Sequence, residues 1–355
     1  MVDINDAAAL KNLDTIGMHA ALERLAAQCA DAYNIGQKAP LPRVGEVRAV
    51  LVTGLGGSAI GGDLLRVYCQ DRSGVPVAVN RDYNLPAFAD DKTLIFAVSY
   101  SGNTEETLNA FRLAYAKGCR VAVLTSGGKL AALAAEKGVP VVPIPSGLAP
   151  RAATGYLFLP MLAALERLGL LNGIDGAVAE LVEVLRAKTD SYRLEVPSEK
   201  NPAKQLALDF RGRIPVIWGA SGTTEVVALR WKGQVNENAK SPAYCNNFPE
   251  LNHNEIVGFE QPGELLNRLW VVLLKDKGDD PRVECRMEVT KRIIAGKVAG
   301  VTEVASAGES MLARLYSLIY LGDWASFYLA ALYGIDPGPV RVIDYLKGEL
   351  AKQQI

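Results

Sequence analysis

The chain has 355 residues, of which 49% are hydrophobic and 22% charged, and its formal net charge is −1. At about 150 residues per domain, this length suggests two domains. The composition excludes a disordered chain, a fibre and a coiled coil. With so little net charge, no overall field draws the chain to nucleic acid or to an anionic membrane, so we expect neither as a partner.

The cysteines and histidines exclude several kinds of site. Five scattered cysteines without a C-x-x-C pair predict neither a disulfide framework nor a zinc ribbon. His19 and His253 are the only histidines, which excludes a multi-histidine metal site within one chain. The first residues are not typical of a signal peptide, and no stretch reaches 18 uninterrupted apolar residues. We therefore expect a cytoplasmic protein.

The first half of the chain predicts helices followed by a parallel sheet. Residues 6–34 have apolar residues at helical spacing, which indicates one or two opening helices. Short apolar runs then alternate with segments of mostly helical period, which is typical of a parallel sheet covered on both faces. In such sheets, ligands bind at the carboxyl ends of the strands. The predicted strands are 49–55, 75–80, 94–100, 120–126 and 139–145.

The second half repeats this plan. Residues 50–65 and 215–230 share the order of strand, small-residue loop and helix, which suggests a duplicated α/β unit with a boundary between 150 and 205. The other predicted elements are helices at 153–171 and 175–190, a strand at 269–276, a helix at 281–297, a strand and turn at 301–308, a strongly apolar helix at 309–333 and a proline-led terminal helix.

Hydroxyl-bearing residues follow the third predicted strand in the segment SYSGNTEET. Ser99, Ser101 and Thr104 supply the hydroxyls, and the N-terminus of the next helix presents unpaired N–H groups, which favour a phosphate. Together these groups predict a phosphate site that needs no lysine. The alternative is an ordinary helix capped by Asn103 or Thr104 after a buried strand.

The loop after the first strand, GLGGSAIGG, is close to the dinucleotide-binding pattern G-x-G-x-x-G but does not match it. Ala59 stands where the last glycine belongs, and the next strand ends at Asn80 rather than at an acidic residue. The loop is therefore interpreted as a tight turn, or as a second loop that faces a ligand through Gly57 and Ser58.

Two more features carry groups that could take part in chemistry. Arg151 follows the fifth strand, where it could face the ligand cleft, although most arginines are solvated. Residues 234–260 predict a long irregular polar loop, and such loops tend to be functional. The segment contains Glu237 and His253, which could supply acid–base chemistry. The alternative is a surface loop with a spectator histidine.

Several of these motifs resemble a known family. SYSGNTEE is similar to the strand-end motif of sugar isomerase (SIS) domains, which bind phosphosugars. SGLAPRAATGY and, more specifically, WKGQVNENAKSPAYCNNFPELNHNEIVGFE resemble the bifunctional phosphoglucose/phosphomannose isomerases, from about residue 50 to the C-terminus. The resemblance implies two doubly wound parallel-sheet α/β domains, flavodoxin-like sandwiches, one over 1–155 and one over 156–355. It also implies an isomerase of glucose 6-phosphate, fructose 6-phosphate and mannose 6-phosphate, without a metal or redox cofactor.

The resemblance further implies roles for single residues. Arg151 would stabilise negative charge on the C1–C2 oxygens, and Glu237 would move a proton between C2 and C1. His253 would assist ring opening from the partner subunit of a homodimer with a shared active site, and Lys347 would lie near the ring oxygen. The residues expected at the phosphate are Gly57, Ser58, Ser99, Ser101 and Thr104.

The chain departs from the family at one place, and a different class of function stays open. In bifunctional members, a threonine near the final helix makes room around C2 for the mannose substrate. Residues 336–347 contain no threonine, and Gly338 stands about where one is common.

The alternative to an isomerase is a non-catalytic phosphosugar-binding protein, which would keep the hydroxyl loop but would not need Glu237. A Rossmann oxidoreductase is weakened by the missing acidic residue.

Overall fold

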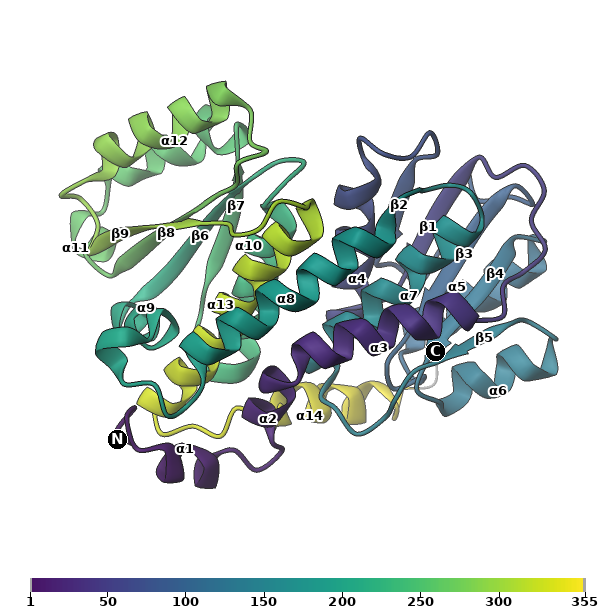
Figure 1. The fold of residues 1–355 in the computed structure, drawn as a ribbon, viewed down its shortest axis with the longest axis horizontal. Helices are drawn as coiled ribbons and strands as arrows, with labels where there is room; N and C mark the ends of the chain where they lie inside the picture. Colours follow the sequence, from purple (N-terminus) through teal and green to yellow (C-terminus); the bar gives the residue numbers. More distant parts are fainter. Residues whose placement is uncertain (1, 354–355) are drawn as a thin grey trace.

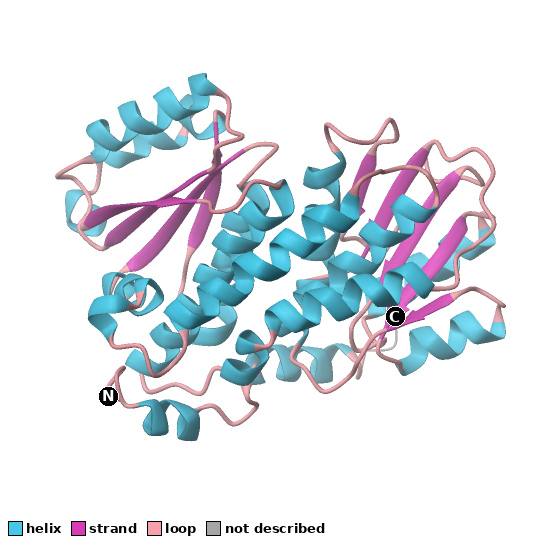
Figure 2. Ribbon diagram, viewed as in Figure 1, coloured by secondary structure: helices cyan, strands magenta, loops and turns pink. Residues whose placement is uncertain are grey.

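The computed structural model describes residues 2–353, which form two parallel β-sheets with helices on both faces of each (Figures 1 and 2). The strands are β1 (Ala49–Thr53), β2 (Val77–Asn80), β3 (Thr93–Val98), β4 (Arg120–Thr125), β5 (Val141–Pro143), β6 (Ile214–Ala220), β7 (Tyr244–Phe248), β8 (Leu269–Lys275) and β9 (Gly300–Ala305).

The helices precede, connect and follow these strands. They are α1 (Ala7–Leu13), α2 (Met18–Glu23), α3 (Leu25–Lys38), α4 (Gly57–Cys69), α5 (Glu105–Ala116), α6 (Gly128–Glu136), α7 (Thr154–Arg167), α8 (Ile174–Tyr192), α9 (Pro202–Phe210), α10 (Glu225–Ala239), α11 (Gly263–Leu266), α12 (Pro281–Ile294), α13 (Met311–Leu332) and α14 (Arg341–Leu350). Short 3₁₀ turns are η1 (Pro150–Ala152), η2 (Ser198–Lys200), η3 (Glu250–His253) and η4 (Glu255–Glu260).

Both sheets are doubly wound, which confirms the predicted fold class. The first sheet has the strand order β2-β1-β3-β4-β5, and the second has β7-β6-β8-β9, with parallel pairing throughout. In each sheet the chain winds in one direction from the first strand and in the other from the next. The switch points therefore lie between β1 and β3 and between β6 and β8, and a switch point is where such sheets bind ligands.

The side chains of the first sheet alternate between two cores. Val52, Phe96 and Val98 face the helices between the sheets, whereas Leu51 and Ile95 pack in a separate cluster with α5 and α6. This alternation follows from the two-residue period of a strand. Because both faces are covered, the strands consist of continuous apolar runs rather than alternating ones.

A layer of helices lies between the two sheets and joins them (Figure 1). One hydrophobic core includes residues of α3, α4, α7, α8, α10 and α13 together with strands from both sheets. The apolar helix predicted at 309–333 is α13, and it is buried along its whole length. The expected domain boundary at 155/156 stays a prediction.

The second half differs from expectation at one place. The segment 234–260 is not an irregular loop, because its first residues complete α10 and the next form the edge strand β7, followed by η3 and η4. β7 is half-buried and carries polar residues, so it lacks the apolar run by which the other strands were predicted. The opening segment forms three helices rather than one or two.

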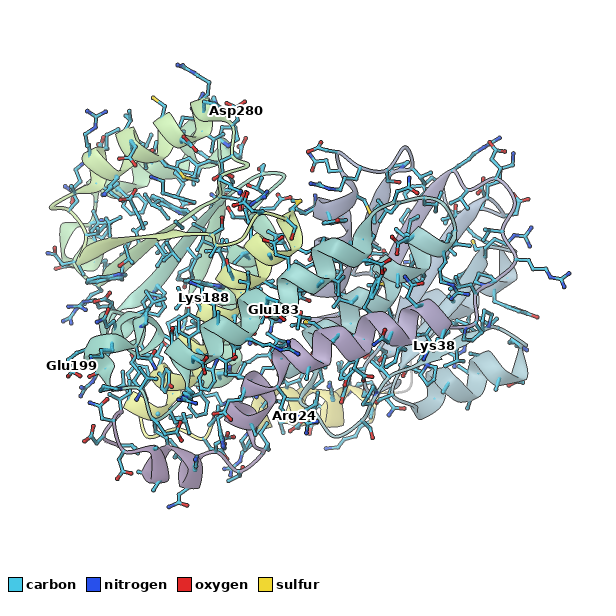
Figure 3. The ribbon with its side chains drawn as sticks, viewed as in Figure 1. Arg24, Lys38, Glu183, Lys188, Glu199 and Asp280 are labelled. Carbon is cyan, nitrogen blue, oxygen red and sulfur yellow. The ribbon has the colours of Figure 1, made fainter. Side chains whose placement is uncertain are left out.

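The outer surface carries charged side chains, including those of Lys38, Glu199 and Asp280 (Figure 3). Asp280 also caps α12 by accepting a hydrogen bond from the backbone N–H of Arg282 at 2.7 Å. Between residues 2 and 353, none of the helices has the length and apolar character needed to cross a membrane.

Lys204 is a buried cation in the second half. Its side chain is fully buried, its Nζ donates a hydrogen bond to the Leu194 carbonyl oxygen at 2.8 Å, and it lies 5.3 Å from the centre of the Tyr328 ring. Burial lowers the pKa of Lys204 to about 8, although nearby carboxylates offset part of this effect. The folded chain therefore releases this proton at a lower pH than the unfolded chain does.

Between pH 8 and pH 10.5 the unfolded state binds more protons at this position than the folded state. Stability therefore increases with pH through this window, relative to a variant without the amine. We expect Lys204→Met, which keeps an unbranched stem, to lose this increase. The measurement is the free energy of unfolding in urea at several pH values from 7 to 10.5. Parallel curves for the wild type and the variant would contradict the assignment.

Candidate active site

The loops after β1 and β3 meet at the switch point of the first sheet. The Tyr100 N–H donates to Ser58 Oγ at 3.3 Å, which ties the two loops together. Gly57, the first residue of α4, lies against the turn η1, where an added Cβ would stand 2.9 Å from the Pro150 carbonyl oxygen. A side chain at position 57 would thus push the first loop away from η1. Glycine is required there by this close approach.

The hydroxyl groups predicted after β3 are only partly engaged with each other. Ser99 Oγ and Thr104 Oγ1 are 2.9 Å apart, and Ser101 Oγ accepts a hydrogen bond from the Asn103 N–H at 3.3 Å. Thr104 stands at the N-cap of α5, but its side chain caps none of the helix N–H groups. The alternative of an ordinary capped helix is therefore wrong for Thr104, and the first N–H groups of α5 stay available.

The tight geometry of this loop depends on Gly102. Its φ is +66°, and an added Cβ would lie 1.8 Å from the Gly127 carbonyl oxygen in the loop after β4. A residue with a side chain would have to separate the two loops. The switch point therefore combines three loops whose backbones approach closely, with Ser101 exposed at the surface.

Arg151 is buried in η1, with only 4% of its surface exposed. Its Nε donates to Asn238 Oδ1 at 2.6 Å, and its Nη2 donates to the carbonyl oxygens of Pro337 and Gly338 at 2.6 and 2.8 Å. Its Nη1 is 3.4 Å from Glu237 Oε2. Burial lowers the pKa of Arg151 and the neighbouring carboxylates oppose this effect, but an arginine remains protonated at any physiological pH.

Glu237 comes from the second half of the chain, on the last turns of α10. Its side chain is 33% exposed, and it borders a cavity of about 150 Å³ together with Arg151. The sequence predicted this carboxylate as part of an irregular loop, whereas the helix holds it rigidly opposite η1. The residues that line this cavity are Gly56, Gly57, Ile60, Arg81, Arg151, Leu229, Arg230, Lys232, Gly233, Gln234 and Glu237.

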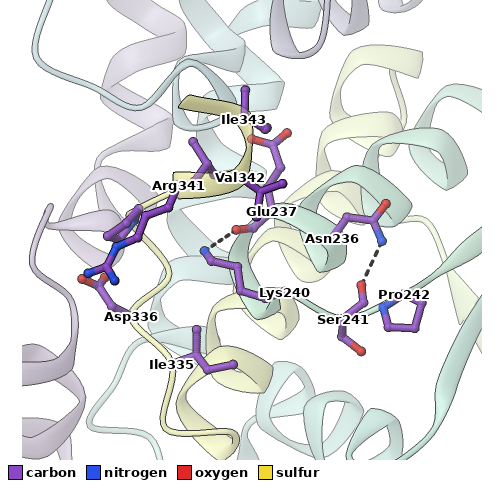
Figure 4. A pocket seen from close by; sticks show the side chains of 12 residues that line it. Asn236, Glu237, Lys240, Ser241, Pro242, Ile335, Asp336, Arg341, Val342 and Ile343 are labelled. Atoms are coloured by element: carbon purple, nitrogen blue, oxygen red, sulfur yellow. Dashed lines mark hydrogen bonds between the residues drawn. The ribbon is translucent and has the colours of Figure 1, made fainter. Parts of the chain in front are cut away.

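Glu237 also lines a larger cavity of about 680 Å³ (Figure 4). The C-terminal end of α10 forms one wall, and the segment from Ile335 to Ile343 forms the other. Lys240 adopts a left-handed backbone with φ +53°, and its Nζ donates to the carbonyl oxygens of Glu237 at 2.5 Å and Pro337 at 3.2 Å. Burial lowers the pKa of Lys240, and the nearby Arg151 adds to this effect.

Two predicted site residues do not line either cavity beside Glu237. His253 lies exposed on η3, after β7, and Lys347 lies exposed on α14. Gly338 does reach the site through its backbone, since its carbonyl oxygen holds Arg151. An added Cβ at Gly338 would lie 2.8 Å from the Ile16 side chain, so a threonine would not fit there without a shift.

The sequence did not predict four other groups at the smaller cavity. Arg81, Arg230 and Lys232 add cationic side chains to its lining, of which Arg81 is paired with Asp63 and Arg230 with Asp323, and Gln234 adds an amide. Arg230, Gln234 and Asn238 recur every four residues on a helix, which is the signal that could have marked one polar face of α10. The Pro337 and Gly338 carbonyls carry no side-chain signal at all.

The fold and this site define a class of protein. Two tandem doubly wound sheets, with a hydroxyl-bearing loop at the first switch point, are the architecture of SIS-domain proteins. A family model described as the bacterial phospho-glucose isomerase C-terminal SIS domain matches residues 199–350. Among solved structures, a glucose-6-phosphate isomerase like protein from Thermus thermophilus has a TM-score of 0.65 at 22% identity, covering 98% of this chain and 99% of that one.

Closer relatives give the family. A bifunctional phosphoglucose/phosphomannose isomerase from Caldicellulosiruptor bescii is 52% identical over 336 residues, which is 94% of this chain and 99% of that protein. One from Aquifex aeolicus is 38% identical over 308 residues, which is 86% of this chain and 91% of that protein. The chain belongs to the bifunctional phosphoglucose/phosphomannose isomerase family.

Proposed function

We propose that this protein is an aldose–ketose isomerase that interconverts glucose 6-phosphate and fructose 6-phosphate, and also accepts mannose 6-phosphate. The observation that carries the proposal is the pairing of a buried cation with a carboxylate. Arg151 Nη1 and Glu237 Oε2, from separate halves of the chain, face each other at 3.4 Å beside a cavity. Family membership supports the same activity.

The chemistry requires one base that serves two adjacent carbons. Glu237 takes the proton from C2 of the open-chain aldose, and the C2–H electrons form the C1–C2 double bond while negative charge collects on O1. A proton passes from the C2 hydroxyl to O1, and Glu237 returns its proton to C1, which yields the ketose. Arg151 Nη1 lies beside the base, where a fixed cation stabilises the enediolate.

The phosphate is assigned to the loops at the first switch point. Ser99, Ser101 and Thr104 supply hydroxyls, and at the start of α4 Gly57 supplies a backbone N–H group and Ser58 a further hydroxyl. Lys232 gives the cavity further positive charge, which favours an anionic substrate.

Ring opening is assigned to His253 of the partner subunit and to Lys347. The support is that His253 is exposed and, within its own chain, lines neither of the cavities beside Glu237. In addition, α14 is amphipathic but has no buried residue, and it exposes Val342 (82%), Tyr345 and Leu346. Such an apolar face is typical of an interface. We therefore propose a homodimer with a shared active site. We also propose that the protein is cytoplasmic.

The first test of the activity is a coupled assay. Fructose 6-phosphate is added with a glucose-6-phosphate dehydrogenase, and the absorbance of the reduced nicotinamide is followed. The isomerase predicts steady product formation, whereas a protein that only binds phosphosugars predicts none. Mannose 6-phosphate as the starting substrate tests the second activity in the same assay.

Thr104→Val tests the phosphate assignment. Loss of the hydroxyl should weaken substrate binding by about 1–3 kcal/mol, the usual cost of stranding a hydrogen-bonded partner. The Michaelis constant for fructose 6-phosphate should therefore rise. Thr107→Val is the matched control and should leave it unchanged, because the Thr107 hydroxyl is buried on the same helix with no hydrogen-bond partner among the described residues. An unchanged Michaelis constant in Thr104→Val would contradict the assignment.

Glu237→Gln tests the base. The substitution keeps the size of the side chain but removes the proton acceptor, so kcat should fall at least ~10²-fold. In heavy water, the wild type should incorporate deuterium at C2 of the glucose product, and the variant should do so far more slowly. Exchange and isomerisation at the wild-type rate would exclude Glu237 as the base and leave Glu250 and Glu255 as the nearest carboxylates in the following segment.

Mixing two inactive variants tests the shared site. Glu237→Gln and His253→Ala are co-expressed with different tags, and heterodimers are purified through both tags. One of the two sites in each heterodimer then has both residues, so about half of the wild-type activity per dimer should return. Heterodimers that stay inactive would show that His253 acts within its own chain.

A further inference from the structure

The interface between α10 and α13 contains a set of buried polar residues that the mechanism above does not use. They are Arg230, Gln234 and Asn238 of α10 and Asp323 and Ser326 of α13, here called the polar seam. Each is at most 3% exposed, although α13 is otherwise nearly all apolar. Buried ion pairs and amides often contribute less stability than apolar packing would, so stability alone does not explain the polar seam.

Every member of the polar seam is hydrogen-bonded to another. Arg230 binds Asp323 through two bonds, Nε to Oδ1 at 3.0 Å and Nη2 to Oδ2 at 2.7 Å. Gln234 Nε2 donates to Asp323 Oδ1 at 2.9 Å. Asn238 Nδ2 donates to Ser326 Oγ at 2.9 Å, and Ser326 Oγ donates to the Asp323 carbonyl oxygen at 2.7 Å. A fully bonded buried network of this kind is rigid.

Within the described residues, two side chains of the polar seam form hydrogen bonds to Arg151. Arg230 Nη2 donates to the Arg151 carbonyl oxygen at 2.9 Å, which holds the backbone of η1. Asn238 Oδ1 accepts from Arg151 Nε at 2.6 Å, which holds the side chain. Because an arginine side chain can only donate hydrogen bonds, the Asn238 atom that faces Arg151 Nε must be the acceptor Oδ1, and this sets the orientation of the Asn238 amide.

These contacts leave Arg151 one free edge. Nε is taken by Asn238 and Nη2 by two carbonyl oxygens, so only Nη1 faces Glu237. The distance from Nη1 to Glu237 Oε2, 3.4 Å, exceeds the usual 2.7–2.9 Å of a charge-assisted hydrogen bond. A guanidinium free to turn would close on this carboxylate as a bidentate pair and occupy the oxygens that must take the substrate's proton.

We propose that Asn238 is a positioning residue, through which the polar seam keeps Arg151 beside Glu237 without letting the two groups close on each other. Asn238 directly follows Glu237 on α10. The helix therefore holds the proposed base and the residue that positions Arg151 in a fixed relation to each other. The inference rests on the proposed function, because it assigns Arg151 and Glu237 their parts in the reaction.

A double-mutant cycle tests the inference. Asn238→Ala is made in the wild type and in Arg151→Lys, since a lysine lacks the guanidinium Nε–H that Asn238 holds. In the wild type, kcat should fall about 10- to 100-fold with little change in KM, because misplacement by about 1 Å costs rate on this scale. In the lysine background the same substitution should change kcat by less than about threefold, as expected of residues that act through one another.

Two more variants separate positioning from general destabilisation. Ser326→Ala removes the group that orients the Asn238 amide but keeps the amide itself, and serves if Asn238→Ala does not fold. Its loss in kcat should be smaller and should also disappear in the lysine background. Asn236→Ala is the matched control, because it removes an amide on the other flank of Glu237 that donates to the Ser241 carbonyl oxygen at 2.9 Å. Its effect, whatever its size, should be the same in both backgrounds.

The outcomes distinguish this inference from the proposed function. If Asn238→Ala and Ser326→Ala lose the same factor in both backgrounds, the polar seam does not act through Arg151 and the inference is wrong, while the isomerase activity stands. A wild-type kcat in Arg151→Lys would overturn the inference together with the role of Arg151. A wild-type protein with no activity on either hexose phosphate would overturn the proposed function itself.

Discussion

The bidentate pair between Arg230 and Asp323 is the interaction on which the site depends most. It lies in the helix layer between the two sheets, where neither charge contacts bulk water. A buried charge requires a partner, and removing one member of such a pair typically costs about 3–5 kcal/mol. The pair therefore fixes α10 against α13, and through the Arg151 carbonyl oxygen it also fixes η1 against both helices.

This arrangement explains how two halves with separate sheets form one site. Arg151 follows the last strand of the first sheet, whereas Glu237 lies near the end of the helix that follows the first strand of the second. Neither sheet alone places the two groups together. The two groups are brought together by the shared core of α3, α4, α7, α8, α10 and α13. Because these helices are closely packed, they hold η1 and the end of α10 at a fixed separation. The segment after α13 then closes the site with two backbone carbonyls.

The phosphate end and the C1–C2 end of the proposed substrate would contact parts of the site that are built differently. The phosphate loops consist of small residues whose backbones approach closely, as at Gly57 and Gly102, so their shape is set by the chain itself. The Arg151–Glu237 end is set by side chains held in a buried network. A phosphate is bound alike by many hydroxyl and N–H arrangements, whereas proton transfer tolerates little displacement. The more rigid support lies where the chemistry is more demanding.

The sequence by itself determined the two parallel sheets, the hydroxyl loop at Ser99–Thr104 and the buried helix α13, because each depends on local periodicity or on the residues next to it. It also pointed to Arg151 and Glu237, through motifs that resemble a family. It missed β7, whose half-buried edge position needs no apolar run, and it placed Glu237 in a loop rather than on a helix. Only the tertiary structure decided that Asn238 joins Arg151 to Ser326, since hydrogen bonds that span 87 and 88 residues of chain leave no periodic trace in the sequence.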